Sequence, residues 1–248
     1  MKRFLDRLWI AAFWLVLWEG VSLCLNQPLL LPSPVSVAAR LLQLVPTLPF
    51  WESLARSSIR ILSGFALGSL TGVLFAIPSA ACATVRRLLR PVMTAVKAIP
   101  VASFVILSLV WLNSRSLSTF IAFLMSLPPC YLGALEGIGA ADAQLLEMAR
   151  VFQIPLTRRV TGIYVPAALP AFRTALSLSM GLCWKAGVAA EVIGLPRGTL
   201  GERLYHAKIY FLTEDLFAWT AVIIALSACF ERVLLSALDA LSKRMGEI

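Results

Sequence analysis

The chain has 248 residues, of which 59% are hydrophobic and only 14% are charged, with a net charge of +9 at pH 7. Soluble domains are typically ~45–50% apolar and about 25% charged, so this composition excludes an ordinary soluble domain and predicts a membrane protein. The basic residues lie scattered between apolar runs and form no single patch, which argues against a nucleic-acid partner and in favour of membrane topology.

Residues that could carry enzyme chemistry are scarce. The five cysteines lie mostly in apolar segments and form no C-x-x-C pair, so we interpret them as small packing residues, and His206 is the only histidine. Neither a metal site nor a Ser/His/Asp triad can be built from this set. No G-x-x-x-x-G-K-[ST] motif is present, so the chain itself is not expected to bind or hydrolyse a nucleotide. We therefore expect no catalytic residue, no metal and no cofactor of its own.

The first part of the chain predicts one span and an external segment. Residues 8–25 are apolar and follow a basic start, and Glu19 and the lack of an A-x-A site favour an uncleaved span over a signal peptide. Residues 26–52 are rich in proline, and the spacing of Val37, Leu41 and Leu44 predicts a short amphipathic helix lying outside.

The second span is predicted over residues 59–83. Gly64, Gly68 and Gly72 form two overlapping G-x-x-x-G steps within it. Small residues four positions apart allow a neighbouring helix to approach closely. We expect that neighbour in the same chain, with a second copy as the alternative.

Two further spans are predicted before the central polar segment. Arg86, Arg87 and Arg90 indicate a turn, and a short third span follows from Pro100 to about residue 112, with Lys97 at its start. The fourth span, residues 117–135, is expected to break or kink at Pro128 and Pro129.

Residues 147–166 are too polar to be a span. Leu145, Ala149 and Phe152 recur at i, i+4, i+7, a spacing that predicts a short amphipathic helix. Because this helix lies between two membrane helices, its apolar stripe needs a binding surface, which we expect on a partner subunit on the cytosolic side.

The fifth span, 165–195, is expected to bend where Pro166 and Pro170 enter it. A polar external stretch (196–215), a sixth span (216–241) and a short tail complete the chain.

Six spans place both termini on one side, and the basic residues indicate the cytoplasmic side. The inside set is Lys2, Arg3, Arg7, Arg86, Arg87, Arg90, Lys97, Arg150, Arg158, Arg159, Lys243 and Arg244. The smaller outside set is Arg40, Arg56, Arg60, Arg115, Arg197, Arg203 and Lys208.

Charges within spans are costly and mark candidate transport residues. Lys185 and Glu191 lie deep in the fifth span, about 240° apart around a helix, so they do not pair along one face. We hypothesise that the face with Lys185, together with Trp184 and Glu191, belongs to the translocation path and that Lys185 attracts an anionic or polar solute. The alternative is a structural ion pair of Lys185 with Glu19 or Glu191 of another helix or subunit.

The central segment also carries a family resemblance. It reads Glu147, Met148, Ala149, three residues, Gln153, nine residues, then Ile163, Tyr164, Val165, Pro166. This resembles the E-A-A, G, I-x-L-P pattern in the cytosolic loop of permease subunits of ATP-binding-cassette (ABC) importers. Gln153 replaces the motif glycine, and because glutamine favours helix we expect it to extend the short helix toward Pro155.

Three other stretches are similar to the nitrate, sulfonate and taurine branch of these permeases: SSIRILSGF (57–65), GLCWKAGVAAEVIG (181–194) and TEDLFAW (213–219). The resemblance implies an all-α, type I permease fold with six transmembrane helices and a cytosolic coupling helix. It divides the chain into residues 1–56, a permease domain at 57–241 and a cytosolic tail at 242–248.

The resemblance also implies partners and roles. The chain would sit in the bacterial cytoplasmic membrane, surrounded by lipid, and pair with a second, identical permease subunit. Two ATPase subunits would use ATP and Mg, and an extracytoplasmic binding protein would deliver a small solute of the sulfonate or nitrate type. Residues at the ATPase groove would be Glu147, Ala149, Arg150 and Phe152; Gln153, Ile154 and Pro155 would shape the turn, and Ile163 and Pro166 would anchor it. A stand-alone secondary transporter or channel is the alternative, disfavoured because no inverted repeat is evident.

Overall fold

The computed structural model describes residues 2–246, with side chains described for residues 9–240, and this part of the chain contains helices and no strand. The longer helices are α1 (Lys2–Leu25), α3 (Leu48–Ala81), α4 (Ala83–Ala98), α6 (Ser114–Gly139), α9 (Val165–Gly194) and α11 (Thr213–Gly246). The shorter ones are α2 (Pro34–Leu44), α5 (Val101–Ser108), α7 (Ala143–Val151), α8 (Leu156–Arg159), the π-helical turn η1 (Val160–Tyr164) and α10 (Leu200–Ile209). The predicted tail, 242–248, continues α11 to Gly246, and its side chains lie outside the described part.

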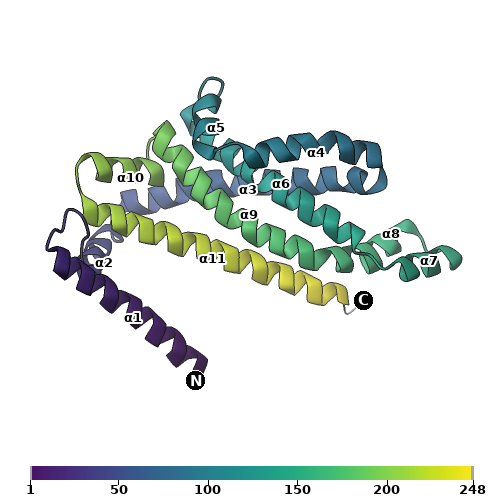
Figure 1. Cartoon of the computed structure of the whole chain (residues 1–248), viewed down its shortest axis with the longest axis horizontal. Helices are drawn as coiled ribbons and strands as arrows, with labels where there is room; N and C mark the ends of the chain where they lie inside the picture. The colour runs from purple at the N-terminus through teal and green to yellow at the C-terminus, as the bar shows by residue number, and fades with distance from the viewer. Residues whose placement is uncertain (1, 247–248) are drawn as a thin grey trace.

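The bundle is built around α6, which packs against α3 on one side and α9 on the other (Figure 1). α11 runs along α9, and α4 lies beside α3 and α6. α10 and α2 lie at one end of the bundle, and α7 and α8 extend beyond the opposite end, where the chain also ends (Figure 1). α1 contacts mainly α2 and diverges from the bundle.

Glycine makes the closest contacts of this bundle possible. A Cβ atom on Gly72 would lie 2.9 Å from the carbonyl oxygen of Leu127 and from the backbone nitrogen of Tyr131, so α3 meets the α6 backbone directly. Gly64 and Gly68 face the same helix. On the other side of α6, a Cβ on Gly137 would lie 2.6 Å from the Cα of Ala168. The neighbour of the G-x-x-x-G steps is therefore in the same chain, as helix packing in a bilayer favours.

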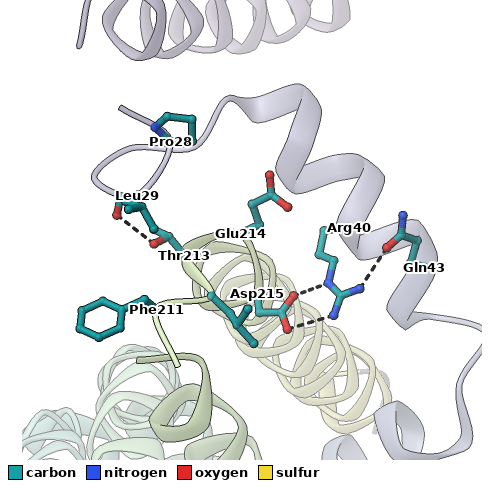
Figure 2. Close-up of a pocket in the computed structure, with 9 residues that line it drawn as sticks. Pro28, Leu29, Arg40, Gln43, Phe211, Thr213, Glu214 and Asp215 are labelled. Atoms are coloured by element: carbon teal, nitrogen blue, oxygen red, sulfur yellow. Dashed lines mark hydrogen bonds and ion pairs between the residues drawn. The ribbon is translucent and has the colours of Figure 1, made fainter. Parts of the chain in front are cut away.

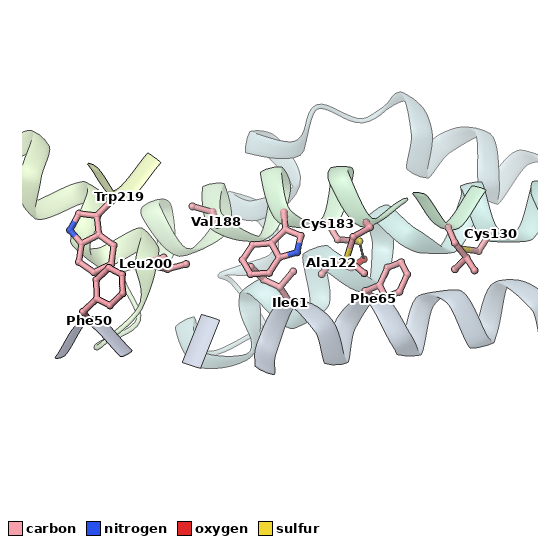
Figure 3. Packing of buried hydrophobic residues seen from close by; sticks show 12 residues of the cluster. Phe50, Ile61, Phe65, Ala122, Cys130, Cys183, Val188, Leu200 and Trp219 are labelled. Atoms are coloured by element: carbon pink, nitrogen blue, oxygen red, sulfur yellow. Dashed lines mark hydrogen bonds between the residues drawn. The ribbon is translucent and has the colours of Figure 1, made fainter. Parts of the chain in front are cut away.

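The core follows α9 from one end of the bundle to its middle. Figure 3 shows Phe50 and Trp219 at one end and Cys130 at the other, with Ile61, Phe65 and Cys183 between them. The rings of Phe50 and Trp219 are stacked with centroids 5.2 Å apart. Stacked rings of this kind add specific contacts to the burial of apolar surface.

The number of spans is four or five by length and composition of the described helices, short of the predicted six. Four helical runs are long and apolar enough to cross a membrane: Leu48–Ala81, Ser114–Gly139, Leu156–Gly194 and Thr213–Ala240. The pair α4 and α5 could make a fifth, and Trp9–Leu25 is apolar but shorter. The helix that contains the predicted second span begins earlier than residue 59, at Leu48, and Pro49 suits its first turn. The predicted domain boundary at residue 56 consequently falls inside α3.

The third span differs from its prediction. Arg86, Arg87 and Arg90 lie within helix α4 and not in a turn, and the apolar helix α5 has only eight residues. The two helices are bent by 100°. The cause is Pro100, which disfavours helical backbone in the residue before it, so that Ile99 is extended with ψ of 130°.

The predicted break at Pro128 and Pro129 is wrong, because α6 continues through both prolines to Gly139. The alternative of a kink in a continuous helix stays a prediction. Close packing on two sides supports the helix where hydrogen bonds are lost.

The fifth span is likewise helical through Pro166 and Pro170, in a run from Leu156 to Gly194. The π-helical turn η1 lies directly before this entry, where the bend was predicted, and turns of this kind are sites at which helices bend.

The predicted amphipathic helix between the first two spans is confirmed as α2. Pro34 occupies its first turn, and the Ser33 hydroxyl caps it by accepting a hydrogen bond from the Ser36 N–H at 3.1 Å. Val37 is buried, and Leu41 and Leu44 pack against the core. The polar stretch 196–215 contains a helix that was not predicted, α10.

We expect Gly72→Ala to destabilise the bundle by about 1–3 kcal/mol, because the added methyl group must push α3 away from the α6 backbone. Gly139→Ala is the matched control, since a Cβ there meets nothing within 4 Å. Thermal unfolding in detergent, followed by tryptophan fluorescence, measures the difference. Equal unfolding temperatures for the two variants would contradict the packing described here.

Candidate functional site

The polar segment between α6 and α9 begins with helix α7. Asp142 caps it, because its carboxylate accepts a hydrogen bond from the Gln144 N–H at 2.8 Å. The helix projects beyond the bundle at the end where α6 stops and α8 begins (Figure 1). A short helix in this position is reachable by another subunit.

The end of α7 is a Schellman motif centred on Gln153. The Ile154 N–H donates to the Ala149 carbonyl at 2.9 Å, and the Gln153 N–H donates to the Arg150 carbonyl at 3.0 Å. Gln153 has φ of 51°, the left-handed conformation that glycine adopts most easily. The prediction that Gln153 extends the helix is therefore wrong: the helix ends at Val151, and glutamine takes the conformation of the glycine that it replaces.

The chain then turns a fixed corner into α8. Pro155 is the N-cap residue of α8, and Arg159 Nε donates to the Ile154 carbonyl at 2.7 Å, which ties the corner to the next helix. Farther along, Ile163 lies in the π-helical turn and Pro166 in the first turn of α9. The residues predicted to shape the turn and to anchor it thus occupy the corner and the start of α9.

Exposed apolar side chains surround this corner. Val151 is 78% exposed, Phe152 72% and Leu156 71%, whereas Ala149 is completely buried. Glu147 and Arg150 are exposed. The predicted stripe of Leu145, Ala149 and Phe152 is unevenly exposed, because Leu145 and the helix-capping residue Phe152 are exposed whereas Ala149 is buried. A partner can reach Glu147, Arg150 and Phe152, but not Ala149.

The three residues assigned to a translocation path are not brought together. Trp184 is buried, with its ring stacked on Phe230 at 5.7 Å, and Glu191 is completely buried. Lys185 is exposed on another face of α9. The residues next to Lys185 on that face have small side chains. One turn before it, a Cβ on Gly181 would meet nothing within 4 Å, and one turn after it, Ala189 is exposed.

Within this chain Lys185 pairs with neither Glu19 nor Glu191, and the alternative of an ion pair with another subunit stays a prediction. Glu191 instead accepts hydrogen bonds from the Ser57 hydroxyl and from the Gly201 N–H. Among the residues whose side chains are described, Lys185 has no ion-pair partner. The contact of Glu191 with α3 and α10 was missed, because α10 itself was not predicted.

A second polar cluster joins α2 to α11. Arg40 on α2 forms a two-pronged ion pair with Asp215 at the start of α11 and donates to Gln43 at 3.0 Å (Figure 2). The hydrogen bonding to Asp215 raises the pKa of Arg40 further above its usual range. The cluster lines an open cavity of about 450 Å³ whose rim includes Phe211. Because Arg40 and Asp215 are paired with each other, we interpret this contact as one that holds α2 against α11.

Gln153 gives a direct test of the corner. We expect Gln153→Gly to stabilise the end of α7 and Gln153→Val to destabilise it, by about 1–2 kcal/mol, because a left-handed backbone is costly for residues with a Cβ and most costly for branched ones. Hydrogen exchange of the peptide that contains Ile154 measures this. Slower exchange in the valine variant than in the glycine variant would contradict the assignment.

Comparison with known proteins places these features in a family. Residues 54–247 match the family described as binding-protein-dependent transport system inner membrane component. The taurine transport system permease protein TauC of Escherichia coli K12 is 26% identical, over 96% of this chain and 89% of its own. The putative aliphatic sulfonates transport permease protein SsuC of Bacillus subtilis is 26% identical, over 89% of this chain and 81% of its own.

A probable ABC transporter permease protein of Haemophilus influenzae is also 26% identical, over 92% of each chain. The family match covers most of the chain, including most of α3, the other three long apolar helices and the α7 corner. The chain therefore belongs to the inner-membrane permease components of binding-protein-dependent, ABC-type transport systems.

Proposed function

We propose that this chain is the membrane-spanning subunit of an ATP-driven importer for a small sulfonate-type solute, and that α7 receives force from a separate ATPase. The observation that carries the proposal is the exposed apolar corner formed by Val151, Phe152 and Leu156, where α7, which projects from the bundle, meets α8. Large apolar side chains left exposed together mark an interaction site. The relatives named for taurine and aliphatic sulfonates support the solute class.

The corner suits a coupling role because it is held rigidly. Its Schellman hydrogen bonds and the Arg159 contact leave α7 few ways to move relative to α8. A short helix with an exposed apolar side fits a groove on a partner. Because α8, η1 and α9 form one helical run, a push on α7 would reach the membrane helix α9 directly.

The assembly would contain two ATPase subunits, which use ATP and Mg, a second identical permease subunit and an extracytoplasmic binding protein.

In this assembly α7 would face the cytoplasm. The helix α4, with Arg86, Arg87 and Arg90, begins at the same end of the bundle as α7, and the positive-inside rule assigns such an end to the cytoplasm. Both termini would then be cytoplasmic. ATP-driven closure of the ATPases would bias the permease between inward- and outward-open states.

Lys185 is the residue proposed to meet the solute. It is a cation on an exposed face of a membrane helix, and an exposed charge in this position favours a water-filled path over lipid. Gly181 and Ala189 leave room above and below its side chain. In a dimer, two such ammonium groups would favour an anionic solute such as a sulfonate.

We expect Phe152→Asp to abolish co-purification with the ATPase subunit of the same transport system, because a charge replaces an apolar contact at the centre of the corner. Phe211→Asp is the matched control: Phe211 is equally exposed and follows a similar helix end, but it lies at the opposite end of the bundle. Retained ATPase binding by the Phe152 variant, or its loss in the Phe211 variant, would overturn the assignment of α7.

We expect Lys185→Met to lower uptake of labelled taurine by about tenfold or more, because an anion in the path would lose its counter-charge. Lys208→Met, on the exposed end of α10, is the control. Both variants should still bind the ATPase. Unchanged uptake and apparent affinity in the Lys185 variant would exclude the solute role, and uptake driven by an ion gradient without the ATPase would favour a stand-alone transporter.

A further inference from the structure

The helical run from Leu156 to Gly194 connects the two ends of the bundle. It contains 39 residues. At 1.5 Å per residue, such a helix is about 58 Å long, roughly twice the apolar thickness of a bilayer. One end follows the α7 corner, and the other end meets α10 (Figure 1). A movement of the helical run at the α7 corner can therefore be transmitted to its other end, at α10.

A buried carboxylate lies where this run meets α10. Glu191 is completely buried, and its Oε2 atom accepts hydrogen bonds from the Ser57 hydroxyl at 2.6 Å and from the Gly201 N–H at 3.2 Å. The Ser57 hydroxyl in turn accepts the Leu200 N–H at 2.9 Å. Leu200 and Gly201 form the first turn of α10, whose N–H groups have no partner within their own helix. The carboxylate and the serine therefore hold the positive end of α10.

The contact between α10 and α9 is close as well as polar. A Cβ on Gly201 would lie 2.5 Å from the backbone nitrogen of Val192, so the first turn of α10 lies directly on the last turns of α9. α10 is also tied to α3, because Arg203 Nε donates to the Ser53 hydroxyl at 3.2 Å. α10 is thus a docked helix whose start depends on α9 and α3.

Packing alone does not account for Glu191. Its second oxygen, Oε1, makes no hydrogen bond of normal geometry among the described residues, although the Ser118 hydroxyl and the Arg60 guanidinium lie close enough to act on the carboxylate. A buried carboxylate with an unsatisfied oxygen is costly, and an apolar side chain of similar size would fill the space at lower cost. What the carboxylate supplies, and an apolar side chain cannot, is an acceptor for Ser57 and for the start of α10.

We propose that Glu191 is a positioning residue that fixes α10 to the outer end of α9, so that movement imposed on α9 at the α7 corner is transmitted to α10. The proposal rests on the coupling role proposed for α7. Under this proposal, α10 is the external element that responds to the state of the ATPases. Glu191 and Ser57 form the hydrogen-bonded joint that connects α10 to α9 and α3.

The experiment measures hydrogen exchange of the peptide 200–209 in the purified full-length permease in lipid nanodiscs. Glu191→Leu should speed exchange about tenfold or more, because the Gly201 N–H and the Ser57 hydroxyl lose their acceptor and α10 is held less firmly at its start. Glu191→Gln keeps an acceptor oxygen and should remain close to wild type, and Ser57→Ala should fall between them. Glu52→Leu, an exposed acid on α3 at the same end, is the control. Unchanged exchange in both Glu191→Leu and Ser57→Ala would overturn the joint.

The second stage repeats the measurement on the permease–ATPase complex with a non-hydrolysable ATP analogue. Nucleotide should change α10 exchange in the wild type and in Glu191→Gln, but not in Glu191→Leu. No nucleotide effect in the wild-type complex, or an equal effect in Glu191→Leu, would overturn transmission through Glu191. If the ATPase does not bind the wild-type permease, the coupling role of α7 fails instead, while the first stage still decides whether Glu191 holds α10.

Discussion

The fold depends on direct backbone contact across α6. Between membrane helices there is little hydrophobic driving force, so stability has to come from close packing and from hydrogen bonds within the protein. Gly64, Gly68 and Gly72 bring α3 onto one side of α6, and Gly133 and Gly137 bring α9 onto the other. This three-helix core holds α9 in place, and α9 in turn positions the α7 corner at one end and Glu191 at the other.

The polar groups of the core follow from the same constraint. Where no water is available, each buried hydroxyl needs a partner within the protein. Ser126 and Ser179 donate back to the carbonyls of Ala122 and Ala175, at 3.1 and 2.6 Å, so they add no demand on neighbouring helices. Glu191 is different, because its partners lie on α3 and α10, so it ties α9 and α10 to a helix that is distant in sequence.

The sequence predicted the features that have a local cause. The G-x-x-x-G spacing of α3, the amphipathic helix α2 and the short polar helix between two spans all follow from residues within a few turns of one another. Features with a tertiary cause were missed. Proline suggested a break in α6, yet packing against α3 and α9 keeps this helix continuous. The docking of α10 depends on Ser57 and Glu191, which are 134 residues apart, and no local pattern reveals that contact.

The corner at Gln153 shows how context can outweigh the preference of a single residue. Glutamine favours helix, but Pro155 cannot continue one. The Schellman hydrogen bonds to the Ala149 and Arg150 carbonyls also require a left-handed backbone at Gln153. The same hydrogen-bond pattern ends α10, where Phe211 has φ of 55° and the Leu212 N–H donates to the Ala207 carbonyl at 2.9 Å. In both places a residue with a side chain adopts the left-handed backbone conformation that glycine adopts most easily. The geometry of the turn, and not the glycine itself, is therefore what the corner between α7 and α8 requires, and a corner fixed in this way can carry force from α7 into α9.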